Sequence, residues 1–460
     1  MLKRAFYDRE DEQRRLRRFV KAGNAGLVVV YGRRRCGKST LLQRILSARH
    51  IYFQADQRET PLQLELLAAA LAGQLADFDK VKYRSWDELL SSLYARADRL
   101  MHVCLDEFPY LVQADPALPS VLQRYIDRPD GRVAWFLCGS SQRMMHGLVM
   151  DRRAPLYGRA REIIKIEPLS AGWLMPALGL DADEAVRAYA TWGGVPRYWE
   201  LASEYPSQQE ALEDLVWNPR GVLHEEPSRL LLDDLRSAVQ PHSILSLIGV
   251  GCHRPSEIAA RMRKPLSSLT RPLSQLCELG YVRRDVPFAE NPKKTRRALY
   301  RLNDPFLRFF FRFVLPHESA LAQGILREAM QQWKHERRQL VAACWEDLCR
   351  AAVPWLPGAD AGFGAASAWW HHANRQAEID LLARSPDGKS LLLGECKWSD
   401  RKKAIDLSAI DRRLREKAEH VPAARAKRIV TSCWLGRDAR TIGQVDRLLT
   451  AQHVMSALRR

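Results

Sequence analysis

Residues 25–40 read AGLVVVYGRRRCGKST, an apolar run followed at once by a basic, glycine-containing segment. The run from 25 to 31 is continuous and does not alternate with polar residues, which predicts a strand buried on both faces of a parallel sheet. The segment 32–40 fits the pattern G-x-x-x-x-G-K-[ST], and STLLQRILSA (39–48) has the apolar spacing of a helix. A strand, this loop and a helix in that order predict a phosphate-binding loop.

The composition of this loop suits a nucleotide. Its glycines let backbone N–H groups curl around phosphate oxygens, and the following helix adds the partial positive charge of its N-terminus. We expect Lys38 to reach the β- and γ-phosphates and the Ser39 hydroxyl to ligate Mg²⁺, so ATP and Mg²⁺ are the expected cofactors. The residues expected to bind the nucleotide are Gly32, Arg33, Arg34, Arg35, Cys36, Gly37, Lys38, Ser39 and Thr40, together with Asp106.

A second apolar stretch supplies the acidic residues that an ATPase of this kind needs. MHVCLDEFPYLV (101–112) reads as a strand, and Asp106 within it is expected to hold Mg²⁺ together with Ser39. Glu107 follows directly and is expected to polarise the attacking water. An acidic pair beside a strand can also cap a helix, which is the alternative interpretation.

Two further side chains are candidates for the hydrolytic step. VAWFLCGSS (133–141) reads as a strand that ends near Ser140, a candidate sensor of the γ-phosphate. The alternative is a plain strand-to-turn boundary. PLYGRAR (155–161) places Arg159 after a glycine, where a mobile arginine is a candidate arginine finger, acting in cis or from a neighbouring chain. The alternative here is a solvated basic loop.

The wider pattern divides the chain into regions of different character. Strand and helix patterns alternate as far as about residue 168, which predicts an α/β domain with a parallel sheet and right-handed crossovers. Three short amphipathic helices and two strands around a basic tip follow at 240–303, which predicts a winged helix-turn-helix. A last region, from about 319, combines helical stretches with a strand-rich α/β core.

The predicted winged helix carries groups that suit phosphate contacts. SSLTRPLSQLCELG (267–280) is the expected recognition helix, and the wing tip NPKKTRR (291–297) is basic. DNA is therefore an expected partner, although winged helices also serve as protein-binding or regulatory lids. The residues expected to face the partner are Ser267, Ser268, Thr270, Arg271 and Gln275 on the helix, and Lys293, Lys294, Arg296 and Arg297 on the wing.

The motifs GRRRCGKST, LDEF, CGSS, PLYGRA and GGVPRYW, in this order, resemble an archaeal and bacterial ATPase family of the AAA-like, STAND-like P-loop class and, more distantly, the origin-recognition ATPases. The resemblance spans essentially the whole chain and implies Arg159 as the finger position. The implied domains are a P-loop ATPase domain at 1–168, a helical lid with GGVPRY at 169–238, a winged helix at 239–316, and a restriction-endonuclease-like PD-(D/E)xK α/β domain at 317–460.

Charged residues interrupt an apolar pattern in RQAEIDLLARSPDGKSLLLGECKW (375–398). Asp387-Gly388 predicts a hairpin with a two-residue type I′ turn. In that register Asp380 faces Glu395 and Glu378 faces Lys397, and strict alternation places all four on one face. Opposed carboxylates repel each other unless a cation lies between them, so we expect a divalent metal at Asp380 and Glu395.

This arrangement suits a metal-dependent phosphodiesterase. Lys397 is expected to position water or to stabilise developing charge, and Glu346 in CWEDLCRA (344–351) to add a ligand or a water contact. The set resembles the PD-(D/E)xK core, with Ile379-Asp380 in place of Pro-Asp. The alternatives are an exposed ladder in which Lys397 pairs with Glu378, or a nuclease fold that has lost activity.

Charge and hydropathy limit the classes of partner. The net charge of +18 favours binding to polyanions such as nucleic acid. The alternative is a basic, solvated surface without such a partner. No apolar stretch approaches the roughly 20 residues of a membrane helix, and the N-terminus lacks a signal-peptide pattern, so we expect no membrane association and a cytoplasmic location. The nine cysteines form no CxxC pair, and Cys104 and Cys138 are expected to be buried.

Together these features predict an ATP-binding and ATP-hydrolysing protein that engages nucleic acid, with a Mg²⁺-dependent phosphodiesterase domain at its C-terminal end. The alternative is a nucleotide-switched regulator that binds DNA or a protein partner and carries an inactive nuclease fold. An arginine finger acting in trans would require a homo-oligomer.

Overall fold

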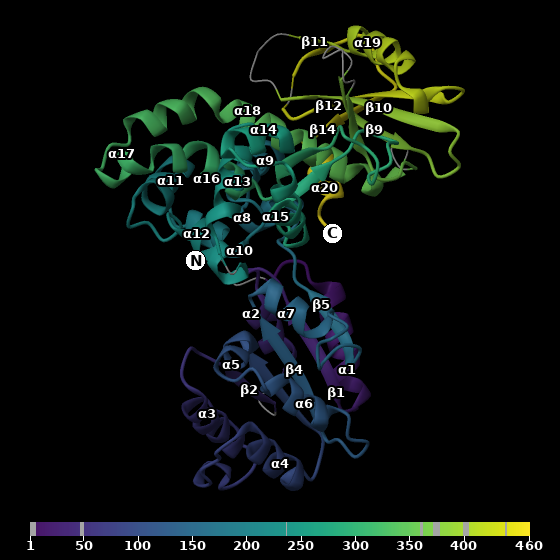
Figure 1. The fold of residues 1–460 in the computed structure, drawn as a ribbon. Coiled ribbons are helices and arrows are strands. Elements are labelled where there is room, and N and C mark those ends of the chain that lie inside the picture. The colour runs from purple at the N-terminus through teal and green to yellow at the C-terminus, as the bar shows by residue number, and fades with distance from the viewer. Residues whose placement is uncertain are drawn as a thin grey trace. The chain divides into compact units, whose positions relative to one another are not determined.

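The computed structural model describes residues 6–46, 50–235, 237–358, 362–370, 378–398, 404–437 and 439–460. These residues form two compact units, and Figure 1 labels many of their elements. The P-loop unit comprises Asp8–Pro168 and Leu230–Arg236. The C-terminal unit comprises Leu169–Arg229 and Ser237–Arg460, with the N-terminal residues as far as Tyr7. Within the described ranges, no helix is both long enough and apolar enough to span a membrane.

A five-stranded parallel sheet forms the centre of the P-loop unit, as the alternating pattern predicts. The strand order is β2 (Ile51–Gln54), β3 (Met101–Asp106), β4 (Val133–Gly139), β1 (Gly26–Tyr31) and β5 (Ala160–Lys165). The helices around it are α1 (Glu10–Ala22), α2 (Lys38–Ile45), α3 (Thr60–Ala72), α4 (Trp86–Arg96), α5 (Phe108–Ala114), α6 (Leu118–Ile126) and α7 (Gln142–Val149).

The register of this sheet brings three strand ends to one edge. Tyr31 of β1 pairs with Gly139 of β4, and Gln54 of β2 pairs with Asp106 of β3. Because the strands are parallel, the loops that follow β1, β3 and β4 all leave from this edge, where α/β sheets place their ligands. Covering the sheet buries the valines of β1 completely, and Cys104 and Cys138 are buried as predicted.

The strand predicted for 101–112 is shorter than expected. β3 ends at Asp106, and α5 begins at Phe108. Glu107 between them has a left-handed backbone with a φ of 54°. Pro109 lies in the first turn of α5, a position that proline tolerates, whereas it cannot donate to a β-ladder. The apolar residues of FPYLV therefore belong to a helix that packs on the core.

The C-terminal unit begins with helices and a small hairpin. Its first helices are α8 (Leu174–Leu178), α9 (Ala182–Trp192), α10 (Pro196–Ala202), α11 (Gln208–Leu212) and α12 (Glu226–Asp234), the last of which ends in the P-loop unit. Then come α13 (Val239–Gly249), α14 (Pro255–Met262), α15 (Ser267–Glu278) and the antiparallel strands β6 (Val282–Asp285) and β7 (Leu299–Leu302). The helices α16 (Pro305–Phe313), α17 (Glu318–Ala322) and α18 (Arg327–Ala352) follow.

A second five-stranded sheet completes this unit. The strand order is β14 (Arg447–Thr450), β12 (Arg428–Leu435), β10 (Ser390–Lys397), β9 (Glu378–Arg384) and β8 (Ser367–Trp370). β10, β12 and β14 are parallel to one another, and β9 is antiparallel to both of its neighbours. The apolar face of α19 (Leu407–Glu419) packs on this sheet, and α18 contacts β9 and β10. The chain closes with α20 (Ala451–Ala457).

The β9–β10 hairpin has the predicted register but a different turn. The ladder runs from Arg384↔Leu391 to Leu381↔Gly394. A type I′ turn requires a positive φ at both central residues, and only Gly388, with a φ of 70°, has one. The Gly388 N–H donates to Ser385 O at 2.9 Å, so the chain reverses through an ordinary turn followed by a left-handed glycine. The predicted type I′ turn is therefore wrong.

Strict alternation along β9 is not kept either. The pairs Ser367↔Leu382 and Trp369↔Ile379 contain one more residue on β9 than on β8, which is a bulge. As a result Ile379 and Leu382, three positions apart, pack in the same core cluster against α19. The prediction that alternation alone sets the face of Asp380 is therefore wrong, because the bulge lies where the carboxylate projects.

Candidate functional site

The loop after β1 has the backbone that a phosphate cradle requires. Gly32 has a φ of 149°, and a Cβ there would lie 2.2 Å from Ile166 O, so only glycine fits. Gly37 has a φ of 87° and immediately precedes α2. The Lys38 side chain is 5% exposed, and its ammonium donates to Arg33 O at 3.0 Å across the loop. The loop is thus wrapped around its own lysine.

Asp106 and Ser39 are held together beside this loop. The Ser39 hydroxyl donates to Asp106 Oδ2 at 2.7 Å, and the Tyr52 hydroxyl donates to the same oxygen. Burial, and after it the hydrogen bond to the charged Asp106, raises the pKa of Tyr52 well above its usual value, so the phenol stays a hydrogen-bond donor. A hydroxyl and a carboxylate oxygen form a donor set that Mg²⁺ prefers, and the two residues present therefore fit this ion.

Glu107 and Ser140 also meet, as their strand ends suggest. Glu107 Oε2 accepts from Ser140 N at 3.1 Å and from Ser140 Oγ at 3.0 Å. The left-handed backbone of Glu107 turns its side chain from β3 toward the end of β4, the neighbouring strand. Gly139 permits this approach because a Cβ there would lie 2.6 Å from the Pro109 ring. The candidate general base is thus oriented by the candidate sensor.

Sequence patterns missed two residues that support the loop. Arg9 is 4% exposed and donates to Cys36 O at 3.5 Å and to Glu167 O at 2.5 Å, which ties the P-loop to the strand exit after β5. Tyr52 holds Asp106, as described above. Arg9 lies in a charged N-terminal segment and Tyr52 in an ordinary apolar strand, so neither carries a local signal of its role.

Arg159 and Arg34 are engaged by carboxylates of the P-loop unit. Arg159 Nε donates to both oxygens of Asp127, at 2.8 and 3.0 Å, and its hydrogen bonds hold the pKa of Asp127 below its usual value. The structure therefore places Arg159 against Asp127. Arg34 of the P-loop pairs with Asp233 at 3.1 Å.

In the C-terminal unit, the bulge in β9 brings Asp380 against β10. Asp380 Oδ2 accepts the Cys396 N–H at 2.8 Å, so a side chain takes the place of a ladder bond. The Asp380 carbonyl accepts from Arg350 Nη1 at 2.7 Å. Glu346 lies one helical turn before Arg350 on α18, and their closest charged atoms are 3.7 Å apart.

The carboxylates here repel one another. Burial, followed by the charge of Asp380, raises the pKa of Glu346 to about 7. Burial, followed by the charge of Glu395, raises the pKa of Asp380 to about 6. Glu346, Asp380 and Glu395 therefore form one electrostatically linked centre, drawn from α18, β9 and β10.

Glu395 differs because lysines surround it. Lys397 Nζ lies 2.5 Å from Glu395 Oε1, and Lys417 Nζ lies 3.6 Å from Glu395 Oε2. Burial alone would raise the pKa of Glu395, but Lys397 and then Lys417 outweigh it and hold the pKa below its usual value. Lys397 thus pairs with Glu395, whereas Glu378 offers only its carbonyl, to Lys417 at 2.6 Å. The alternative pairing of Lys397 with Glu378 is not formed.

Carboxylate oxygens suit a hard cation, yet the centre is not gathered as a complete ligand set. Among the side chains that the structure describes, no group of three His, Cys, Asp or Glu residues is close enough to hold a metal ion. One oxygen of Asp380 is used by Cys396 N–H, and one oxygen of Glu395 by Lys397. Asp380 and Glu395 remain the candidate ligands.

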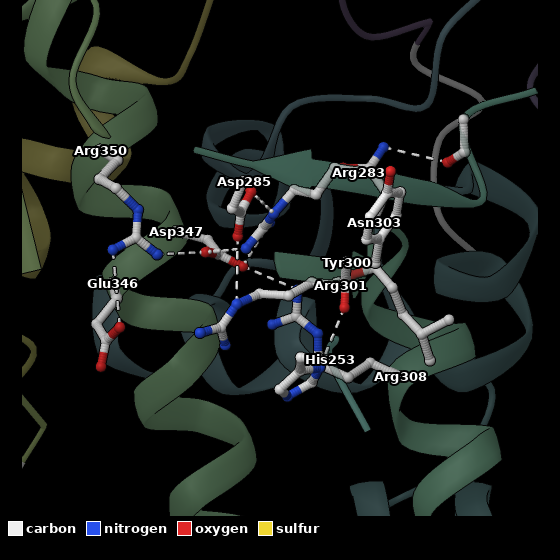
Figure 2. A network of polar contacts seen from close by, with 12 residues as sticks. His253, Arg283, Asp285, Tyr300, Arg301, Asn303, Arg308, Glu346, Asp347 and Arg350 are labelled. Atoms are coloured by element: carbon white, nitrogen blue, oxygen red, sulfur yellow. Dashed lines mark hydrogen bonds and ion pairs between the residues drawn. The ribbon is translucent and has the colours of Figure 1, made fainter. Parts of the chain in front are cut away.

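Next to this centre, arginines converge on Asp347 (Figure 2). Arg283 Nη2 and Arg350 Nη2 each donate to Asp347 Oδ1 at 2.6 Å, and Arg308 Nη2 donates to Oδ2 at 2.8 Å. Burial alone would raise the pKa of Asp347, but Arg283 and the other arginines hold it well below its usual value. β6, α16 and α18 are thereby joined, and Arg350 extends the network to Asp380.

The loop between β6 and β7 packs on the edge of the second sheet. Phe288 N donates to Ala368 O at 2.9 Å, and the Arg297 guanidinium contacts the carbonyl of Trp370. Arg297 also pairs with Glu290 at 2.5 Å. Of the basic wing residues, Lys293, Lys294 and Arg296 are exposed, while Arg297 is half-buried. The prediction that Arg297 faces a partner is therefore wrong in this structure, because it binds β8.

Comparisons with known proteins agree with the P-loop geometry. Residues 6–201 match a family model described as an ATPase domain predominantly from Archaea, and residues 310–408 match one described as archaeal and bacterial proteins of unknown function. The uncharacterized protein MJECL04 of Methanocaldococcus jannaschii is 28% identical over 423 residues, which cover 90% of this chain and 92% of the relative.

Solved structures give the fold. The Walker-type ATPase paby2304 of Pyrococcus abyssi superposes with a TM-score of 0.52 and 20% identity, over 66% of this chain and 96% of its own. A weaker likeness is to the ORC2 protein of Aeropyrum pernix in ADPNP–ADP complexes, with a TM-score of 0.46 and 16% identity, over 72% of this chain and 97% of its own. The P-loop unit therefore has the fold of the P-loop ATPases, and residues 6–201 match the ATPase domain model.

Proposed function

We propose that this protein binds ATP with Mg²⁺ and hydrolyses it. The observation that carries the proposal is the pair of contacts at one sheet edge, Ser39 to Asp106 at 2.7 Å and Ser140 to Glu107 at 3.0 Å. Ser39 and Asp106 would hold Mg²⁺, which supplies charge neutralisation for the β- and γ-phosphates when bound. Glu107 accepts the proton of the attacking water, and Ser140 holds the Glu107 carboxylate in place.

Lys38 has a defined role in this scheme. In the structure its ammonium donates to Arg33 O, a carbonyl of its own loop. Phosphate oxygens are stronger acceptors because both partners are then charged. The Lys38 side chain therefore moves from the carbonyl to the β- and γ-phosphates without crossing water, since it is already buried.

The test is ATP turnover together with binding of a fluorescent ATP analogue. Glu107→Gln keeps the side-chain volume, so we expect retained binding and a loss of turnover of about 10²-fold or more. Lys38→Ala should lose binding. Glu65→Gln, which removes an exposed carboxylate from α3, is the matched control. Turnover of Glu107→Gln equal to that of the control would contradict the assignment.

The proposed arginine finger requires Arg159 to exchange partners. Its guanidinium now pairs with Asp127, which lies just after α6. Asp127→Asn frees Arg159 and should raise turnover if the finger acts, while Arg159→Ala should lower it. Mixing Arg159→Ala chains with Lys38→Ala chains restores turnover only if the finger acts in trans within a homo-oligomer. An absence of change in both single variants would remove Arg159 from the mechanism.

We further propose that residues 239–302 form a winged helix that engages DNA. Supporting this are the three helices and hairpin in that range and the exposed basic residues beside α15, namely Arg261, Arg263, Lys264 and Arg271. Such contacts are to phosphates, so affinity should fall steeply as salt rises. Arg271→Ala should lower the salt slope by about one unit. Negligible DNA affinity at low salt would favour a protein-binding role instead.

A second candidate activity is Mg²⁺-dependent phosphodiester cleavage at Glu346, Asp380, Glu395 and Lys397. Its support is the linked pair of raised carboxyl pKa values, because burying mutually repelling carboxylates is costly unless a cation neutralises them. Lys397, already beside Glu395, would stabilise charge that develops on the phosphate. The alternative is that this fold only grips DNA or a partner under nucleotide control.

Nicking of supercoiled plasmid separates these two possibilities. Wild type is compared with Glu395→Ala, Asp380→Ala and Lys397→Ala, with Mg²⁺ or Mn²⁺ and with or without ATP. Glu378→Gln is the control, since Glu378 is an exposed carboxylate on the same strand as Asp380. Cleavage by wild type and the control alone would support a nuclease. DNA binding without any scission would support the regulator.

A further inference from the structure

The segment Leu230–Leu235 belongs to the P-loop unit, although α12 begins at Glu226 in the C-terminal unit. Leu230, Leu231 and Leu235 are nearly fully buried, whereas Leu232 is exposed. The chain then continues directly to α13, the first helix of the proposed winged helix. This short segment therefore belongs to the same unit as the nucleotide loop and leads along the chain to the proposed DNA-binding residues.

Two consecutive carboxylates of this segment contact two different parts of the nucleotide site. Asp233 Oδ2 accepts from Arg34 Nη1 of the P-loop at 3.1 Å. Asp234 Oδ1 accepts the Gln142 N–H at 2.8 Å, and Asp234 is 3% exposed. Gln142 is the first residue of α7 and lies two residues after Ser140, the partner of Glu107. One turn of helix thus joins the P-loop to the sensor strand.

The two contacts differ in strength. The Arg34 and Asp233 side chains are each about one third exposed, 32% and 35%, so their ion pair is weak and easily exchanged. The Asp234 bond is buried and charge-assisted, so it holds the segment in place. A change at the nucleotide therefore acts first on Asp233.

We propose that Asp233 and Asp234 are positioning residues that report the nucleotide state to the chain leading into α13. The proposal rests on the ATP binding proposed above. A triphosphate in the loop offers Arg34 a more highly charged anion than Asp233 and repels the Asp233 carboxylate. Arg34 then turns to the phosphate, and Leu230–Leu235 loosens while Asp234 retains it. ADP, with less charge, loosens the segment less.

Hydrogen–deuterium exchange of the backbone amides of 230–235 tests this in the full chain. Exchange is measured without nucleotide, with Mg²⁺ and ADP, and with Mg²⁺ and a non-hydrolysable ATP analogue. We expect exchange up to about fivefold faster with the ATP analogue, the change that corresponds to an exposed ion pair of about 1 kcal/mol. Asp233→Asn should show the faster exchange without nucleotide and no further response to it.

Two comparisons show whether the effect belongs to this ion pair. Glu225→Gln, which removes an exposed carboxylate from just before the same helix, should respond to the analogue as wild type does. Arg34→Asp should accelerate exchange, and the double variant Arg34→Asp with Asp233→Arg should restore protection. If Asp233 had only a structural role, Asp233→Asn would alter the exchange rate of the 230–235 amides by the same factor with and without nucleotide.

The outcomes also separate this inference from the proposed function. If the fluorescent analogue binds and exchange of 230–235 is unchanged, the inference is overturned and ATP binding stands. If the analogue does not bind, the proposed function fails and the inference fails with it. Failure of the charge swap to restore protection would overturn the role of Asp233 in the nucleotide-free protein.

Discussion

Replacing Asp347 with asparagine removes the only carboxylate shared by Arg283, Arg308 and Arg350 in the contacts described above. Asparagine keeps the size of the side chain, so the substitution changes charge and hydrogen bonding rather than packing. Arg283 then keeps Asp285 at 3.0 Å and Arg350 keeps Glu346 at 3.7 Å, whereas Arg308 loses the carboxylate that it contacts at 2.8 Å. Arg350 also holds the carbonyl of Asp380, so the perturbation reaches the candidate nuclease centre.

The expected loss of stability follows from the burial of the network. The exposed fractions are 17% for Asp347, 16% for Arg308 and 26% for Arg283. Removing one partner of a buried ion pair costs about 3–5 kcal/mol, because charge is left uncompensated. Because these side chains are still partly exposed, we expect a loss in the free energy of unfolding of about 3 kcal/mol, the lower end of that range. With an unfolding entropy of about 2 cal/mol/K per residue, this loss corresponds to a fall in the Tm of the C-terminal unit of about 5 °C.

The measurement is differential scanning calorimetry of the full chain at neutral pH. Calorimetry is suited because a chain with two units need not unfold in one step, and the transition of each unit can be followed. Glu257→Gln is the control, since Glu257 pairs with Arg254 at 3.8 Å and is 48% exposed. Its loss should be below about 1 kcal/mol.

A double substitution sharpens the test. If the loss in Asp347→Asn comes from arginines left without a counter-charge, then adding Arg308→Met should recover part of it. The two single losses would then exceed the loss of the double variant. A Tm for Asp347→Asn no lower than that of Glu257→Gln would refute the reasoning, because it would mean that water already compensates these charges.

Two further predictions address the two sites. Gly32→Ala should abolish binding of the fluorescent ATP analogue, because the added Cβ would lie 2.2 Å from a backbone oxygen. Gly147→Ala is the control and should still bind, because a Cβ there has open space around it. Equal binding by the two variants would contradict the close approach at Gly32. Glu346 and Asp380 have folded pKa values raised to about 7 and about 6, so the stability they contribute is present at low pH and is lost as pH rises through these values. With a chelator present, raising the pH from 5 to 8 should therefore lower the Tm of wild type more than the Tm of Glu346→Gln. An equal fall in the two proteins would show that the pKa of Glu346 is not raised by folding.

The candidate nucleotide site was largely predictable because its signals are local. The strand, glycines, lysine and serine of 26–40 follow one another in the chain, and each has a backbone or charge requirement that few residues meet. Asp106 and Glu107 were found from the apolar run before them, although the helix at Phe108 was not, since FPYLV is equally apolar as strand or helix. The register of β9 and β10 was predicted because a short hairpin permits few pairings.

The carboxylate centre was predictable in its residues and not in its geometry. Glu346, Asp380 and Glu395 influence one another's pKa values, but a bulge against β8 decides how Asp380 projects. The sequence of β8 gives no sign of where its pairing shifts. The predicted turn type was also wrong. Asp387 serves as an acceptor for Lys389 N at 3.0 Å, and this bond is compatible with an ordinary turn.

By itself, the sequence determined the phosphate-binding loop, its acidic partners, the parallel sheet around them and the hairpin register, because these depend on residues adjacent in the chain or on simple periodicity. Only the tertiary structure decided that Tyr52 holds Asp106, that Asp234 caps α7 beside Ser140, and that Asp347 gathers its arginines. These contacts join residues 54, 92 and 64 positions apart. Ion pairs and hydrogen bonds form between residues that are close in space, and a local sequence pattern does not indicate which distant residue will be the partner.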